Sequence, residues 1–84
     1  MYRVIAKVVS RKGPCGNHKV GDEFIIGEKT PPNVCSGAYN SLFPFAQVML
    51  YGGSFPWARD PSKTTVACPD PENAVVFELR RTSG

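Results

Sequence analysis

Three cysteines and one histidine are the residues of this sequence whose types and spacing suggest metal or thiol chemistry. Cys15 and His18 are separated by two residues in a glycine-rich loop, and this spacing lets one turn present two ligands to a single ion. Cys35 and Cys68 stand alone, so a joint role requires the fold to bring them back to this loop. Three cysteines and one histidine form a tetrahedral ligand set of the kind found in structural zinc sites. The sequence therefore predicts a single Cys₃His metal site.

The candidate ligands are expected at the ends of secondary-structure elements rather than within them. Cys35 immediately precedes a predicted helix, where unpaired backbone N–H groups and the helix dipole stabilise a thiolate. Cys68 follows a predicted strand, and the segment Pro69-Asp70-Pro71 after it indicates a fixed turn. This placement is typical of a site that is built from loops.

Other kinds of chemistry fit the same residues. Sulfur-rich sites also hold iron–sulfur clusters, so a redox protein with the same four ligands is an alternative to zinc. A thiol enzyme without a metal is another alternative, in which His18 activates Cys15 or Cys35 as a nucleophile. The simplest alternative is that the thiols are unlinked, because free cysteine is often buried as a small hydrophobic residue.

Two aspartates close to the candidate ligands are interpreted first as turn residues. Asp22 either orients His18 through its free ring nitrogen or caps a turn after Gly21, and we favour the turn. Asp70, which lies between two prolines, is also expected to stabilise a turn.

Length and composition limit the class of protein. The chain has 84 residues and a net charge of +3, so we expect one domain, residues 1–84, whose small core a metal would supplement.

The basic residues do not form a run with interleaved aromatic residues, which argues against nucleic-acid binding. Charges interrupt the apolar residues at 1–7, and no stretch approaches the ~20 apolar residues that span a bilayer. We therefore expect a cytoplasmic protein that binds neither nucleic acid nor membrane. In that reducing compartment, an odd number of cysteines favours metal or thiol chemistry over disulfides.

Hydrophobic periodicity predicts four short strands and one helix. Alternating apolar residues indicate strands at 2–9, 23–26, 64–67 and 74–80. The helix is expected at about 36–51, before the stop signal Gly52-Gly53. These elements predict an α+β domain with a small, mainly antiparallel sheet on which the helix packs.

The predicted helix contains an apolar stripe and a proline. The stripe that should face the sheet consists of Leu42, Phe45, Val48 and Met49. Pro44 either kinks the helix or starts the second of two short helices, because it has no N–H to donate. After the helix, the two aromatic residues of the irregular segment 54–61 are expected to pack against the core.

The chain resembles a family of short uncharacterised bacterial and archaeal proteins. The resemblance is carried by two motifs, Cys15 followed by His18-Lys19-Val20-Gly21-Asp22, and Cys68-Pro69-Asp70. Further matches are Cys35 with Ala38, Leu42 and Pro44 after it, the segment 52–57, and residues 77–81 near the end of the chain. Asn17 departs from the glycine expected before the histidine. The resemblance implies that the four candidate ligands belong to one site, and it implies no activity.

Together these features lead us to expect a small metal-binding domain. Its metal is expected to be zinc, held by Cys15, His18, Cys35 and Cys68, with a mainly structural role in a binding or accessory module. The partner is expected to be a protein or a small molecule.

Overall fold

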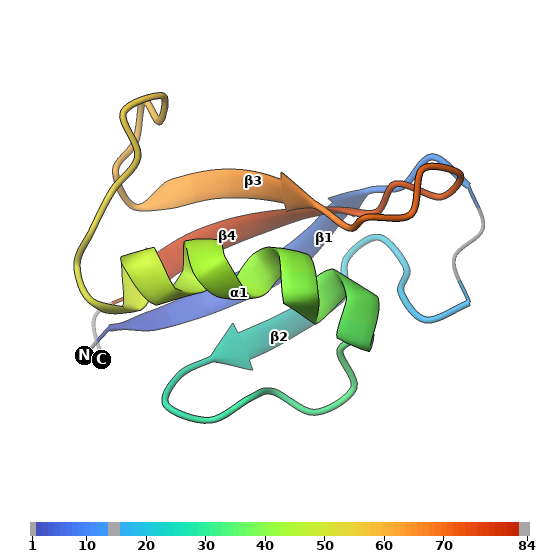
Figure 1. Ribbon diagram of the computed structural model, residues 1–84, viewed down its shortest axis with the longest axis horizontal. Coiled ribbons are helices and arrows are strands. Elements are labelled where there is room, and N and C mark those ends of the chain that lie inside the picture. Colours follow the sequence, from blue (N-terminus) through green and yellow to red (C-terminus); the bar gives the residue numbers. More distant parts are fainter. Residues whose placement is uncertain (1, 14–15, 83–84) are drawn as a thin grey trace.

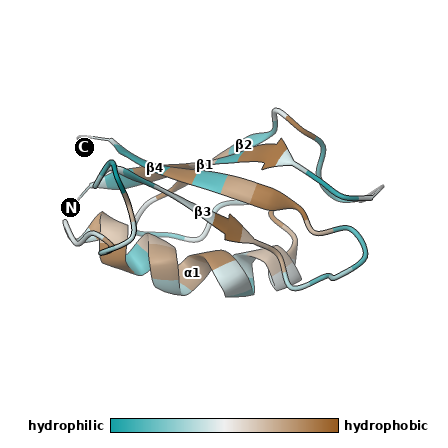
Figure 2. Cartoon of the chain, turned by 90° about the horizontal axis from the view of Figure 1, so that it is seen from above, coloured by the Kyte–Doolittle hydropathy of each residue, from teal (hydrophilic) through white to brown (hydrophobic). Residues whose placement is uncertain are grey.

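The protein consists of two layers, a four-stranded antiparallel sheet and a single helix that crosses one face of the sheet (Figure 1). The computed structural model describes residues 2–13 and 16–82. Seen from above, the helix and the sheet form separate layers with the core between them (Figure 2). The predicted α+β fold is confirmed. Among the described residues, no helix has both the length and the apolar character needed to cross a membrane.

The sheet is formed by strands from both ends of the chain. Its strands are β1 (Arg3–Ser10), β2 (Glu23–Ile26), β3 (Lys63–Ala67) and β4 (Val76–Thr82), in the order β2-β1-β4-β3. Every neighbouring pair is antiparallel. The central pair, β1 and β4, runs from Arg3 opposite Thr82 to Ser10 opposite Val76, with a register shift after Val8. All four predicted strands are present, with ends within two residues of the predicted ones.

The alternation of side chains along β1 and β4 determines which face of the sheet is buried. Val4, Ala6 and Val8 are completely buried beneath the helix. Phe77 and Leu79 of β4 lie opposite Val8 and Ala6, and both are completely buried as well. Because neighbouring residues in a strand point to opposite faces, this register produces one continuous apolar surface for the helix.

The helix α1 (Ser36–Leu50) packs against β1, β3 and β4. Its buried side chains are Ala38, Leu42, Ala46, Met49 and Leu50. The predicted stripe is correct at Leu42 and Met49, and Phe45 is partly buried. It is wrong at Val48, which is 39% exposed. On the helix surface Val48 points roughly 120° away from Leu42, so it lies outside the buried face.

The helix continues through Pro44 without a break. The predicted alternative of two short helices is therefore wrong. Pro44 and Asn40, one turn earlier, are both exposed. The Asn40 carbonyl, which loses its helical donor to the proline, is thus on the side of the helix where water can bond to it.

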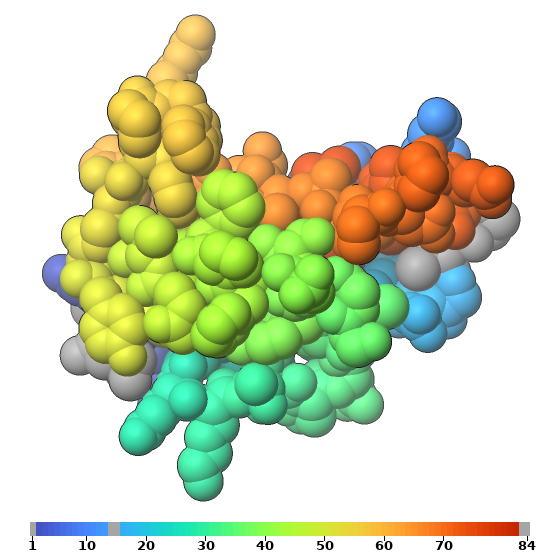
Figure 3. All heavy atoms as spheres, viewed as in Figure 1, coloured from blue at the N-terminus to red at the C-terminus, as the bar shows by residue number. Residues whose placement is uncertain are grey.

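The segment after α1 turns back towards β3 and projects from the body of the molecule (Figure 3). Gly52 begins this turn with a positive φ of 86°, a conformation that glycine adopts without strain. Phe55 packs on Phe45 and on the core, as predicted. Trp57 does not, because it stacks on the outer side of Phe55, with ring centroids 4.9 Å apart, and is 64% exposed. The prediction that both aromatic residues pack against the core is thus wrong for Trp57.

Candidate functional site

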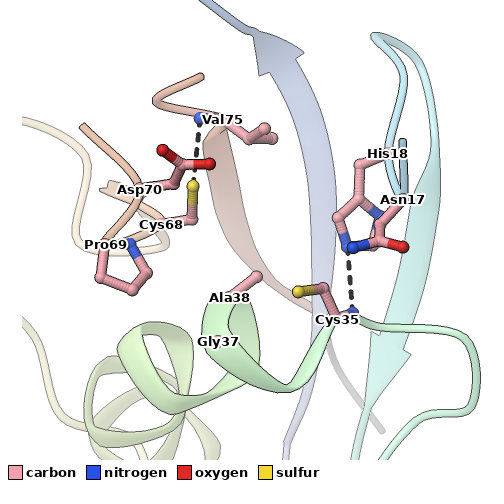
Figure 4. A pocket seen from close by; sticks show the side chains of 9 residues that line it. All are labelled: Asn17, His18, Cys35, Gly37, Ala38, Cys68, Pro69, Asp70 and Val75. Atoms are coloured by element: carbon pink, nitrogen blue, oxygen red, sulfur yellow. Dashed lines mark hydrogen bonds between the residues drawn. The ribbon is translucent and has the colours of Figure 1, made fainter. Parts of the chain in front are cut away.

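A pocket of about 110 Å³ lies between the N-terminal end of α1 and the segment that follows β3. Segments from the first, middle and last parts of the described chain meet here (Figure 3). Figure 4 shows its lining residues, which are Asn17, His18, Cys35, Gly37, Ala38, Cys68, Pro69, Asp70 and Val75. Three of the four predicted ligands are therefore found at one pocket.

Cys35 is the N-cap residue of α1. Its carbonyl oxygen accepts the first helical hydrogen bond, from the Tyr39 N–H at 2.9 Å. The backbone N–H groups of Ala38 and Gly37 lower the pKa of the Cys35 thiol; burial opposes this effect, and the side chain of Asn17 supports it. No side-chain hydrogen bond of standard geometry caps the helix at this residue. The N–H groups of the first turn therefore act mainly through their positive partial charges, which favour the thiolate.

His18 is buried beside the start of the helix and is only 3% exposed. Its ring is held edge-on by Phe24 of β2 and Phe77 of β4, with centroid distances of 5.3 and 5.4 Å. Its Nε2 atom accepts a hydrogen bond of 3.1 Å from the backbone N–H of Cys35. Its Nδ1 atom is buried without a hydrogen-bond partner. The contact between His18 and Cys35 thus involves the main chain of Cys35 rather than its sulfur.

The main chain of the same histidine is also fixed. The Arg11 side chain donates a hydrogen bond of 3.0 Å from Nη1 to the His18 carbonyl oxygen. Both the ring and the backbone of His18 are therefore held in place from neighbouring elements.

Cys68 follows β3 and is partly buried. Its sulfur accepts a hydrogen bond of 3.3 Å from the backbone N–H of Val75, and its own N–H donates to the Val75 carbonyl at 2.8 Å. Cys35 and Cys68 are both free thiols. In Figure 4 the Cys35 sulfur points away from the His18 ring, towards the side of the pocket that carries Cys68.

The turn after Cys68 is stabilised by Asp70, as predicted. The carboxylate of Asp70 accepts hydrogen bonds from the backbone N–H groups of Glu72 and Asn73 and from the Asn73 side chain. The Asn73 side chain and the Glu72 N–H lower the pKa of this carboxyl group. This turn returns the chain to Val75, so that its N–H reaches the Cys68 sulfur.

Asp22 has the simpler of its two predicted roles. Its carboxylate accepts a hydrogen bond of 3.1 Å from the Lys19 N–H, which closes the turn at Gly21. It does not orient the imidazole of His18, because Nδ1 has no partner and Nε2 bonds to Cys35.

The predicted ligand set is only partly described by the structure. Cys15 lies outside the described residues. Within residues 2–13 and 16–82, no three side chains of the histidine, cysteine, aspartate and glutamate types are placed to hold one metal ion. The Cys₃His site therefore stays a prediction, although His18, Cys35 and Cys68 line the same pocket.

Asn17 is a pocket residue to which sequence reasoning assigned no role. It lines the pocket, and its side chain supports the ionised form of Cys35. The only signal in the sequence was its position between Cys15 and His18.

No family model, curated protein or solved structure gives a significant match to this chain. The family resemblance thus stays a prediction.

Proposed function

We propose that this protein is a small metal-binding module in which Cys35 and Cys68 supply thiolate ligands to a soft metal ion, zinc being the expected ion. The observation that carries the proposal is that two cysteines from distant parts of the sequence line one pocket, each beside backbone N–H groups. The N–H groups of the first turn of α1 stabilise negative charge on the Cys35 sulfur, and the thiolate is the form that binds metal.

Further ligands are needed to complete a tetrahedral site. Cys15 is the first candidate, because it lies two residues before Asn17, which lines the pocket. His18 is the fourth member of the predicted set, but it could bind the ion only if its Nε2 atom released the backbone N–H of Cys35. The module would work in a reducing compartment such as the cytoplasm, where its thiols persist, and would serve a protein partner or a small molecule.

A second candidate function is thiol chemistry without a metal. It is favoured by the lowered pKa of Cys35, which increases the fraction of nucleophilic thiolate near neutral pH. In this version the first turn of α1, rather than a base, activates the sulfur, because His18 contacts the main chain of Cys35.

Metal analysis of protein purified without oxygen tests the proposal. We expect zinc in equimolar amount, and uptake of Co²⁺ by the metal-free protein with the intense absorption of cobalt–thiolate bonds. Cys35→Ser and Cys68→Ser should each reduce this absorption, whereas Ser36→Ala, a change next to Cys35, should not.

Three results would contradict this assignment in different ways. Broad visible absorption that bleaches on reduction would identify an iron–sulfur centre on these cysteines. Rapid alkylation of Cys35 by iodoacetamide in a chain that binds no metal would favour the thiol function. Metal bound equally well by both serine variants would place the ion elsewhere in the chain.

A further inference from the structure

The imidazole of His18 has no lone pair available while it keeps its contact with Cys35. A backbone N–H can only donate, so the bond from Cys35 to Nε2 occupies the lone pair of that nitrogen. In the neutral ring the proton then resides on Nδ1, which is the atom buried without a partner. Metal coordination requires a nitrogen lone pair, and a ligating histidine normally donates its other N–H. Neither condition is met here.

We infer that His18 is a positioning residue for Cys35, and that it is not a ligand in this arrangement of the pocket. The Cys35 N–H precedes the first turn of α1, where backbone N–H groups have no helical acceptor. The Nε2 atom of His18 supplies that acceptor from a ring fixed between Phe24 and Phe77.

This contact joins the sheet to the start of the helix. The ring is fixed by side chains of β2 and β4, and through Nε2 it determines where the main chain of Cys35 lies. The position of that main chain in turn determines how close the Cys35 sulfur comes to the N–H groups of the first turn. A Cβ atom added at Gly37 would lie 3.9 Å from this sulfur, an ordinary van der Waals distance, so the first turn and the sulfur are neighbours.

The inference rests on the proposed function only in treating Cys35 as the working group of the site. The hydrogen bond and the ring tautomer can be measured whether or not a metal binds. Failure of the positioning role of His18 is therefore distinguishable from failure of the proposed metal-binding function.

Nitrogen NMR of the imidazole in the protein as purified tests the inference directly. We expect the tautomer with its proton on Nδ1, with the Nε2 resonance of an acceptor and no shift typical of a metal-bound nitrogen. A proton on Nε2, or either nitrogen bound to metal, overturns the inference. The second of these results would at the same time support the metal-binding function.

A pair of matched substitutions tests the positioning role. His18→Gln keeps an acceptor at about the place of Nε2, whereas His18→Asn moves it one carbon closer to the main chain. We expect the Cys35 amide to exchange with solvent about two- to tenfold faster in His18→Asn, as for the loss of one hydrogen bond, and to return towards the wild-type rate in His18→Gln.

The carbon chemical shift of the Cys35 Cβ atom reports whether the thiol is protonated. It therefore tests whether the hydrogen bond from Cys35 to His18 affects the thiol. It should move towards the value of a protonated thiol in His18→Asn and stay near the wild-type value in His18→Gln. Equal exchange rates and equal Cβ shifts in the two variants would overturn the inference. If His18→Asn does not fold, the wild-type tautomer still decides.

Discussion

The ionisation of Cys35 is linked to folding, because the groups that lower its pKa come together only when α1 forms. The N–H groups of Ala38 and Gly37 lower this pKa from the ordinary value of 9.0. By linkage, the ionised thiol adds stability that is fully present above pH 9.0. This stability is lost as the pH falls through the folded pKa. A bound soft metal would lower the pKa of Cys35 in the folded chain further. Both candidate functions therefore predict that the free energy of unfolding rises with pH.

We predict that Cys35 ionises at lower pH in the folded chain than in the chain unfolded in urea. The measurement is the pH dependence of the Cys35 Cβ resonance in both states, with the unfolded chain as the control. The free energy of unfolding should rise with pH between the two midpoints. Equal midpoints in the folded and unfolded chains would show that the first turn of α1 does not stabilise the thiolate.

At the scale of single residues, the sequence allowed local roles to be predicted but not contacts between distant segments. The position of Cys35 at a helix start, and the turn roles of Asp22 and Asp70, depend on neighbouring residues alone. The role of His18 depends on three other elements and on which of its nitrogens faces Cys35. Composition and spacing contain no information about that orientation.

The helix α1 offers a direct test of which side chains hold it on the sheet. Leu42 is completely buried, whereas Val48 is partly exposed on another side of the helix. Leu42→Ala should destabilise the protein by about 3 kcal/mol, because it leaves a cavity in the core. Val48→Ala should cost less than about 1 kcal/mol. Urea unfolding followed by circular dichroism measures both, and similar losses would contradict the observed burial.

The adjacent arginines Arg80 and Arg81 point to opposite faces of β4. The Arg81 guanidinium donates from Nη1 to the Gly53 and Met49 carbonyls, at 2.6 and 3.3 Å, and lies 4.9 Å from the centroid of the Tyr2 ring. It thereby joins β4 to the C-terminal end of α1 and the loop that follows. Arg80 is exposed on the face of the sheet that α1 does not cover.

Arg81→Ala should therefore lower the free energy of unfolding by about 2 kcal/mol, because carbonyl groups at the helix end lose a charged donor. Arg80→Ala is the matched control and should change it by no more than about 0.5 kcal/mol. Arg81→Lys should restore only part of the loss, since lysine lacks the planar donor fork. Thermal melts of the three variants decide the matter, and an equal effect of Arg80→Ala would refute the assigned role of Arg81.

The secondary-structure elements were predictable because their signals are periodic and local. The buried residues of β1 alternate as predicted, and Gly52 ends the helix near the expected position. Trp57 was misplaced because Phe55 fills the position against the core, and only the folded chain shows which of two nearby aromatic residues does so. Val48 was misplaced because several choices of apolar stripe fit the same helix.

At the scale of the whole molecule, the pairing of β1 with β4 determines the architecture. These strands come from opposite ends of the chain, and together they form the centre of the sheet. Their register, and the order of all four strands, could not be predicted because periodicity does not specify which strands are neighbours. The pairing of β3 with the other edge of β4 brings the segment containing Cys68 near the start of α1.

A structural metal would supply a large part of the stability of a domain of this size. An 84-residue domain has a margin of roughly 5–10 kcal/mol, while a structural zinc contributes about 10 kcal/mol or more. If the proposed zinc is structural, a strong chelator or Cys68→Ser should therefore unfold the chain near neutral pH, and added zinc should refold the chelated protein. Thermal melts with and without chelator measure this effect, with Ser36→Ala as a control that should melt like wild type. If chelator does not change the melting curve and Cys68→Ser is folded, the structural role of zinc is contradicted. The pocket would then be a thiol site in a domain that its apolar core stabilises without a metal.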